Sequence, residues 1–138
     1  MKAAITAIGG YVPEYVLANS ELESMVDTND EWIVSRTGIK ERRILKPEEG
    51  RGASYLAIKA VEAMKKEYGV RVDDVDLVIL ASVTADMPVA ITSAYIAQEI
   101  GATNAYAFDL QAACSSFLYA ISNAAAYIES KKYKKVLV

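Results

Sequence analysis

A helical run from about Cys114 to Ser130 constrains the fold more than any other feature of the chain. It has almost no polar side, because apolar residues surround it. They are Phe117, Leu118, Ala120, Ile121, Ala124, Ala125 and Ile128. A helix that is apolar on nearly every side must be buried nearly all round. The chain has only 138 residues, so we expect a second half or a partner to cover this helix.

The rest of the chain alternates strand and helix patterns. Residues 77–81 form a short unbroken apolar run, which is typical of a strand covered on both faces. Two more strands are predicted, at 2–8 and at 105–110. Amphipathic helices are expected at about 52–68 and 92–100, with Gly69 and Gly101 directly after them. Such alternation predicts an α/β fold with a mostly parallel sheet.

Between the first strand and residue 52 the pattern predicts two short helices. Ser20 and Glu23 have capping-box spacing and open one of them, which continues to about 26. Thr28 and Glu31 repeat that spacing before a second helix at 30–36, which Gly38 closes. Residues 36–51 carry six basic and three acidic side chains, and we interpret them as a surface connection.

Composition excludes several classes of function. The formal net charge is −3, which gives no global basic field for nucleic acid or an anionic membrane. No stretch approaches 18 continuous apolar residues, and no signal peptide is recognisable. One Cys rules out an internal disulfide framework and favours a reducing compartment, so we expect a cytoplasmic protein.

The chain contains no His and ends on an apolar run. Without His, a Cys–His or Ser–His pair cannot be completed within these residues. The last residues, 134–138, have the pattern of a strand that has just begun. Because such a strand would leave an edge unpaired, we expect the sequence to be the N-terminal half of a longer protein.

Cys114 is the main candidate for chemistry. It stands where the strand at 105–110 gives way, through Gln111-Ala112-Ala113, to the apolar helix. Unpaired N–H groups and the helix dipole favour a thiolate at a helix start, and the same groups can stabilise an oxyanion. The alternative is that Cys114 is a small buried hydrophobic residue, since free Cys is among the most buried residue types.

Two motifs resemble one family. Residues 32–39, Trp-Ile-Val-Ser-Arg-Thr-Gly-Ile, followed by Glu41-Arg42-Arg43, resemble a signature of β-ketoacyl-acyl-carrier-protein synthase III. Residues 107–117, Ala-Phe-Asp-Leu-Gln-Ala-Ala-Cys-Ser-Ser-Phe, are similar to its active-site segment. That family has the thiolase fold and starts bacterial fatty acid synthesis. The similarity covers the whole chain, although Ser115-Ser116 replace a commoner Ala-Gly.

The resemblance implies roles for four residues besides Cys114. Trp32 and Arg36 share a helix face, and in the family these positions hold the adenine of coenzyme A, with Thr28 close by. The alternative is a Trp packed in the core and an Arg in solvent. Met87, before Pro88, falls where the family often has a bulky residue that reaches into the acyl pocket of the partner subunit, although a core gap-filling Met fits equally well.

The resemblance also implies a complete reaction and its partners. Acyl-coenzyme A would acylate Cys114, and malonyl-acyl carrier protein would then condense with the acyl-enzyme after losing carbon dioxide. The enzyme would be a homodimer of chains about twice as long as this one, with a catalytic His and Asn in the second half. We expect residues 1–138 to form one thiolase-like half-domain with a buried central helix. Neither a metal nor a cofactor is expected beyond the coenzyme A thioester used as substrate.

Two other functions remain open at this point. One is another thiolase-fold acyltransferase, such as a hydroxymethylglutaryl-coenzyme A synthase or a plant-type polyketide synthase. The other is a non-catalytic thiolase-fold fragment in which Cys114 is inert. The lysines at 131, 132, 134 and 135 could meet an acidic carrier protein, but a solvated helix end explains them equally well.

Overall fold

A computed structural model describes residues 2–46, 48, 52–87 and 89–138. The chain divides into two compact units. Unit 1 contains Met1–Tyr11 and Gly52–Val138, and unit 2 contains Val12–Arg51. Among the described residues no helix is both long enough and apolar enough to cross a membrane.

Unit 1 is built on a parallel sheet of three strands. These are β3 (Leu77–Ala81), β4 (Tyr106–Leu110) and β5 (Val136–Leu137). Their order is β4-β3-β5, with Leu77 opposite both Tyr106 and Val136. The predicted strands at 77–81 and 105–110 and the strand pattern at the end of the chain are therefore confirmed, and the sheet is parallel as predicted.

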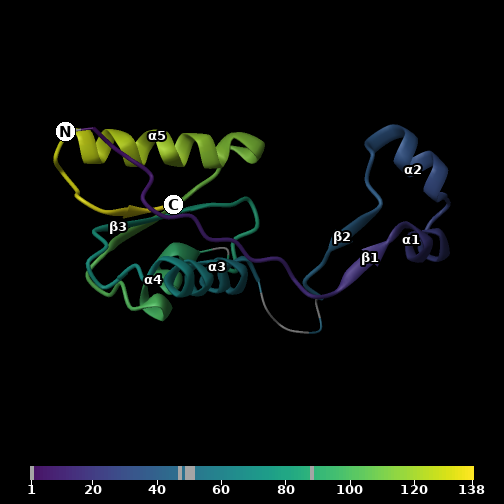
Figure 1. Cartoon of the computed structure of the whole chain (residues 1–138), viewed down its shortest axis with the longest axis horizontal. Coiled ribbons are helices and arrows are strands. Elements are labelled where there is room, and N and C mark those ends of the chain that lie inside the picture. The colour runs from purple at the N-terminus through teal and green to yellow at the C-terminus, as the bar shows by residue number, and fades with distance from the viewer. Residues whose placement is uncertain (1, 47, 49–51, 88) are drawn as a thin grey trace. The chain divides into compact units, whose positions relative to one another are not determined.

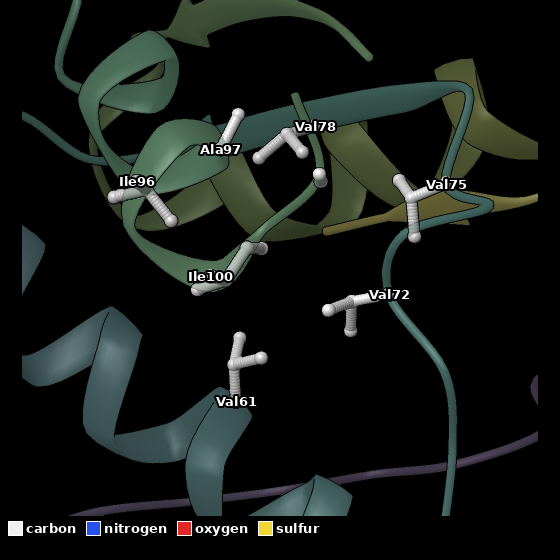
Figure 2. Close-up of a cluster of buried hydrophobic side chains, with 8 residues drawn as sticks. Val61, Val72, Val75, Val78, Ile96, Ala97 and Ile100 are labelled. Carbon is white, nitrogen blue, oxygen red and sulfur yellow. The ribbon is translucent and has the colours of Figure 1, made fainter. Parts of the chain in front are cut away.

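Helices cover both faces of this sheet (Figure 1). α3 (Ala53–Tyr68) and α4 (Thr92–Ile100) lie on one side of β3, and α5 (Ser116–Glu129) lies on the other. On the first side Val78 packs in a cluster with side chains from both helices and from the loop before β3 (Figure 2). The other labelled members are Val61, Val72, Val75, Ile96, Ala97 and Ile100. On the second side Leu77 and Ile79 pack against Ala120 and Ala124 of α5.

The helix ends in unit 1 follow the predicted glycine signals. α3 and α4 end before Gly69 and Gly101, whose φ angles are 63° and 89°. Glycine adopts this left-handed conformation without the steric cost that a Cβ brings. The helices at 52–68 and 92–100 are thus confirmed to within one residue.

The predicted strand at 2–8 is wrong for this structure. These residues belong to unit 1, but none of them is assigned to a strand. A strand needs a hydrogen-bonded neighbour, and the pairing of β3 is taken by β4 and β5. Ile5 and Ile8, which suggested the alternating pattern, are largely exposed.

Unit 2 contains a small antiparallel pair that the sequence did not reveal. β1 (Val16–Ala18) pairs with β2 (Glu41–Arg43), with Val16 opposite Arg43. β2 lies inside residues 36–51, so the interpretation of that segment as a plain connection is wrong at its centre. The two strands have three residues each, which is too short for an alternating pattern to stand out.

The helices of unit 2 form where expected but are capped differently. α1 (Asn19–Met25) begins after Ala18, without a side-chain cap, so Ser20 is not its N-cap. α2 (Asp30–Thr37) is capped by Asn29, whose Oδ1 accepts from the Trp32 amide at 2.8 Å. Asn is as good an N-cap as Thr, and its position directly before the helix decides the choice. Gly38 closes α2 in the left-handed conformation, as predicted.

A buried asparagine holds unit 2 together. Asn19 is almost fully buried. Its Nδ2 donates to Asp30 Oδ1 at 2.7 Å and to the carbonyl of Ile39 at 2.8 Å, while Arg42 Nη1 donates to Asn19 Oδ1 at 2.7 Å. One amide therefore joins α1, α2 and β2, and a buried amide of this kind is stable only because its donors and acceptor are all satisfied.

α5 is buried on one side only within this chain. Ser116, Ala120 and Ala124 are buried, whereas Leu118 is 67% exposed. Phe117 and Tyr119 are also exposed. The described residues alone therefore do not cover this helix, because the sheet covers only the side that faces it; its burial nearly all round stays a prediction for a longer protein. The outward side is an exposed apolar surface within the described residues.

Gly9 lies so close to α3 that a side chain cannot be added without a shift. A Cβ at Gly9 would lie 2.4 Å from the Ala60 carbonyl oxygen and 2.6 Å from Met64 Cβ, while a Cβ at Gly10 would meet nothing within 4 Å. We expect Gly9→Ala to lower the free energy of unfolding by about 1–3 kcal/mol, the usual cost of overpacking. Urea unfolding of Gly9→Ala and Gly10→Ala checks this, and equal midpoints for the two variants would contradict it.

Asp76 ties the end of the chain to β3. Its Oδ2 accepts from the amides of Lys134 and Lys135 at 2.7 and 3.0 Å. These two hydrogen bonds, the Lys134 amide first, lower the pKa of Asp76 below its ordinary value of 3.8. Because the folded-state pKa is depressed, the carboxylate stabilises the fold above the ordinary pKa, and that contribution is lost as the pH falls through the folded-state value.

We therefore expect Asp76→Asn to weaken the acid dependence of stability. Below about pH 4 the difference in unfolding free energy between wild type and variant should shrink as the pH falls. Unfolding followed from about pH 6 to pH 2 measures this. Glu99→Gln, which removes a carboxylate from the exposed side of α4, is the surface control. A constant wild-type–variant difference at every pH would rule out this role for Asp76.

Candidate active site

Cys114 lies in a tight turn between β4 and α5. A single turn of 3₁₀ helix covers Ala113–Ser115, and α5 begins at Ser116. The thiol is therefore two residues before the α-helix, and not its first residue as predicted. Cys114 is exposed, so among the described residues it is not packed as a buried hydrophobic residue. Ala113, directly before it, has a φ of 46°, which residues with a Cβ adopt rarely.

The backbone of this turn is closed by its own hydrogen bonds. The Ser115 amide donates to the Ala112 carbonyl at 3.0 Å, and the Ser116 amide donates to the Ala113 carbonyl. Both amides therefore donate hydrogen bonds within the turn in this structure. The oxyanion donors expected at the helix start are not these two groups.

The hydroxyl of Ser116 adds a second set of bonds to the turn. Ser116 Oγ accepts from the Ala112 amide at 2.7 Å and donates to the Ala113 carbonyl at 2.8 Å. The side chain is 4% exposed. Cys114 thus lies in a turn bonded through both backbone and side-chain groups.

Asp109 performs a structural role that the sequence analysis missed. It lies on β4 opposite Leu80 of β3. Its Oδ2 accepts from the Thr92 amide at 2.9 Å, and its Oδ1 accepts from the Ser93 amide at 2.8 Å. A carboxylate here satisfies two of the amides that a helix start leaves unpaired. The signal in the sequence was a charged residue inside an otherwise apolar strand.

The same network reaches the loop that carries Met87. The Asp86 amide donates to Thr92 Oγ1 at 3.0 Å, and Asp86 Oδ1 accepts from the Ser54 amide at 3.2 Å. Asp86 therefore links the starts of α3 and α4. Met87 follows it and is 48% exposed, so it does not fill a gap in the core of this chain. Pro88 lies outside the described residues.

A second candidate region lies in unit 2, at the start of α2. A hollow of about 260 Å³ is lined by Asp27, Thr28, Asn29 and Trp32. Trp32 is 56% exposed, so it is not a core residue of this chain, and Arg36 is exposed on the same helix. Thr28 Oγ1 is buried without a hydrogen-bond partner among the described residues. An unpaired buried hydroxyl is costly, and a ligand could supply its partner.

No cluster of three or more His, Cys, Asp or Glu side chains suited to a metal ion occurs among the described residues. Unit 1 presents an accessible thiol in a hydrogen-bonded turn. A thiol so placed suits covalent catalysis by transfer of an acyl group.

Comparisons with known proteins show which family this chain is similar to. The family described as 3-oxoacyl-[acyl-carrier-protein (ACP)] synthase III matches residues 108–138, which include Cys114. The beta-ketoacyl-[acyl-carrier-protein] synthase III of Azobacteroides pseudotrichonymphae is 53% identical over 99% of this chain and 41% of its own length. Synthase III 2 of Bacteroides thetaiotaomicron is 51% identical over 100% of the chain and 41% of its own length.

Solved structures show the same fold. The synthase III of Thermus thermophilus aligns with a TM-score of 0.91 and 42% identity, over 97% of this chain and 41% of its own. The priming beta-ketosynthase of the R1128 polyketide pathway aligns with a TM-score of 0.85 and 36% identity, over 92% of this chain and 37% of its own. These matches confirm the predicted thiolase-like α/β class. The chain belongs to the β-ketoacyl-[acyl-carrier-protein] synthase III family and spans about two fifths of the length of the relatives that it matches.

Proposed function

We propose that the protein to which this chain belongs is a 3-oxoacyl-acyl-carrier-protein synthase III, with Cys114 as the residue that carries the acyl group. One observation carries the proposal. The only thiol of the chain is exposed in a hydrogen-bonded turn at the start of α5, within the segment that matches the family.

The first half-reaction would transfer an acyl group to Cys114. Its thiolate attacks the carbonyl carbon of acyl-coenzyme A and forms a tetrahedral intermediate. The bond from that carbon to the coenzyme A sulfur then breaks, and coenzyme A leaves as a thiolate that takes up a proton. A thioester on Cys114 results, so one difficult condensation is divided into two easier steps.

The second half-reaction would extend the acyl group. Malonyl-acyl carrier protein loses carbon dioxide, and the carbanion so formed attacks the thioester carbonyl. The bond to Cys114 Sγ breaks, which releases a 3-oxoacyl product and restores the thiolate. These residues contain no His, and the resemblance to the family implies that the His and Asn which assist decarboxylation belong to a second half of the protein.

Coenzyme A would bind through its adenine at the start of α2. An exposed indole and a guanidinium four residues apart can hold a flat heteroaromatic ring between them. Trp32 lines the hollow there, and Arg36 lies one turn further along α2. The buried hydroxyl of Thr28, which has no partner among the described residues, would gain a hydrogen bond from the ligand.

The remaining parts of the proposal concern the assembly. Met87, exposed on the loop after β3, would line the acyl pocket of the partner subunit in a homodimer. The protein would work in the cytoplasm, with acyl-coenzyme A and malonyl-acyl carrier protein as its substrates. The similarity to a priming beta-ketosynthase supports a second candidate, a condensing enzyme that starts polyketide chains. Identifying the product formed with each carrier protein would separate the two.

Replacement of the nucleophile tests the first half-reaction. Cys114→Ser should abolish transfer of labelled acetyl from acetyl-coenzyme A, because a hydroxyl lacks the nucleophilic thiolate at neutral pH. Mass spectrometry of the intact protein measures the label, and circular dichroism checks the fold. Wild type pretreated with iodoacetamide is the matched control and should also remain unlabelled. Undiminished acetylation of the serine variant would refute the assignment.

Replacement of Trp32 tests the adenine site. Trp32→Ala should weaken binding of coenzyme A by roughly 1–3 kcal/mol, the usual contribution of one base stacked on an aromatic ring. Trp32→Phe keeps an aromatic face and should retain most of the affinity. Titration calorimetry with acetyl-coenzyme A compares the three proteins. Unchanged affinity in Trp32→Ala would end this assignment without affecting that of Cys114.

A further inference from the structure

The turn that presents Cys114 holds a conformation that its sequence does not favour. Ala113 has a φ of 46°. Residues with a Cβ enter this region at a steric cost, and Ala has no side-chain polar group to offset it. A conformation of this kind persists only where its surroundings impose it. The groups that impose it therefore determine where the thiol points.

Ser116 is the side chain placed to impose this conformation. Its Oγ accepts from the amide of Ala112 at 2.7 Å and donates to the carbonyl of Ala113 at 2.8 Å. One hydroxyl thus bonds the residues on both sides of the Ala112–Ala113 peptide. It does so from a site that is 4% exposed, where water competes little for these bonds.

Ser116 is also anchored to the sheet of unit 1 through α5. It is the first residue of α5, and the same side of that helix buries Ala120 and Ala124. Those two alanines pack with Leu77 and Ile79 of β3. The packing of α5 on β3 therefore fixes the position of Ser116, and Ser116 in turn fixes the position of the turn relative to the sheet.

Its neighbour Ser115 offers a direct contrast. Ser115 is exposed, and within the described residues its hydroxyl makes no hydrogen bond, while its amide takes part in the 3₁₀ turn. The two serines are adjacent in the chain, but in the part of it that the structure describes only the hydroxyl of Ser116 makes hydrogen bonds to the turn.

We propose that Ser116 is a positioning residue for acyl transfer, whose hydroxyl holds the Ala112–Ser115 turn in the conformation that orients Cys114 Sγ toward an acyl thioester. This inference rests on the proposed function of Cys114. Attack on a thioester requires the sulfur to approach the carbonyl from a defined direction, and a small misplacement of the nucleophile has a large effect on the rate.

The experiment compares Ser116→Ala with Ser115→Ala in the intact enzyme. Two reactions are followed for each protein: acetylation of Cys114 over a range of acetyl-coenzyme A concentrations up to saturation, and alkylation of Cys114 by iodoacetamide at the same pH. In Ser116→Ala we expect acetylation to fall roughly 10- to 100-fold at an unchanged KM. Alkylation should change by less than about twofold, because a small reagent reaches an exposed thiol from many directions. Ser115→Ala should match wild type in both rates.

A rescue variant separates positioning from a general loss of stability. Glycine adopts a positive φ without strain, so Ala113→Gly lets the turn keep its conformation without the Ser116 hydroxyl. Adding Ala113→Gly to Ser116→Ala should restore most of the acetylation rate. The proposal is overturned if Cys114 is acetylated at the wild-type rate in Ser116→Ala. It is also overturned if acetylation and alkylation fall by the same factor in that variant and adding Ala113→Gly restores neither rate.

Hydrogen exchange gives an outcome that does not depend on the acyl substrate. If wild type is not acetylated at all, the proposed function fails, but the Ala112 amide still reports on the turn. Its exchange should be faster in Ser116→Ala than in Ser115→Ala, because it loses its acceptor. Equal protection of this amide in the two variants would overturn the positioning role, whatever Cys114 does.

Discussion

Burial of β3 on both faces is the constraint from which the architecture of unit 1 follows. Val78 packs on the side of α3 and α4, and Leu77 and Ile79 pack on the side of α5. A strand with no polar side needs a helix layer on each face. Its backbone must also be paired on both edges, and β4 and β5 provide that pairing in parallel. In parallel strands the carboxyl ends lie at the same end of the sheet. The loop with Met87 therefore leaves β3, and the turn with Cys114 leaves β4, at that end.

Asp109 fixes β4 to the start of α4, near the end of the sheet where the chemistry is proposed. On β4 the side chains alternate between the two faces, so Phe108 and Leu110 join the α5 side while Asp109 reaches α4. There its carboxylate satisfies the first amides of the helix. The strand that leads to Cys114 and the helix that follows the Met87 loop are thereby fixed to each other by the carboxylate of Asp109 on β4.

Local patterns in the sequence predicted the elements whose physics is local. The apolar run at 77–81 and the glycines after α3 and α4 each carry their meaning within a few residues, and the structure agrees with them. The strand predicted at 2–8 failed because pairing depends on which other strands are available. β1 and β2 were missed because three residues give no readable period. The cap at Asn29 was missed because the Thr28–Glu31 spacing fits the same rule one residue earlier.

In the candidate site, too, some residues could be predicted from local sequence signals and others could not. Cys114 was identifiable because a lone thiol between a strand and a helix is a local signal, but the partners of Ser116 and Asp109 are contacts that only the folded chain creates. Small side chains in the sequence of α5 explain how the folded chain positions Ser116. Ala120 is fully buried and Ala124 nearly so, and such residues let α5 approach β3 closely, whereas the bulky Phe117, Leu118 and Tyr119 face outward. The first residue of that helix is Ser116, so the packing of alanines against β3 sets how firmly the hydroxyl can hold the turn beside the thiol.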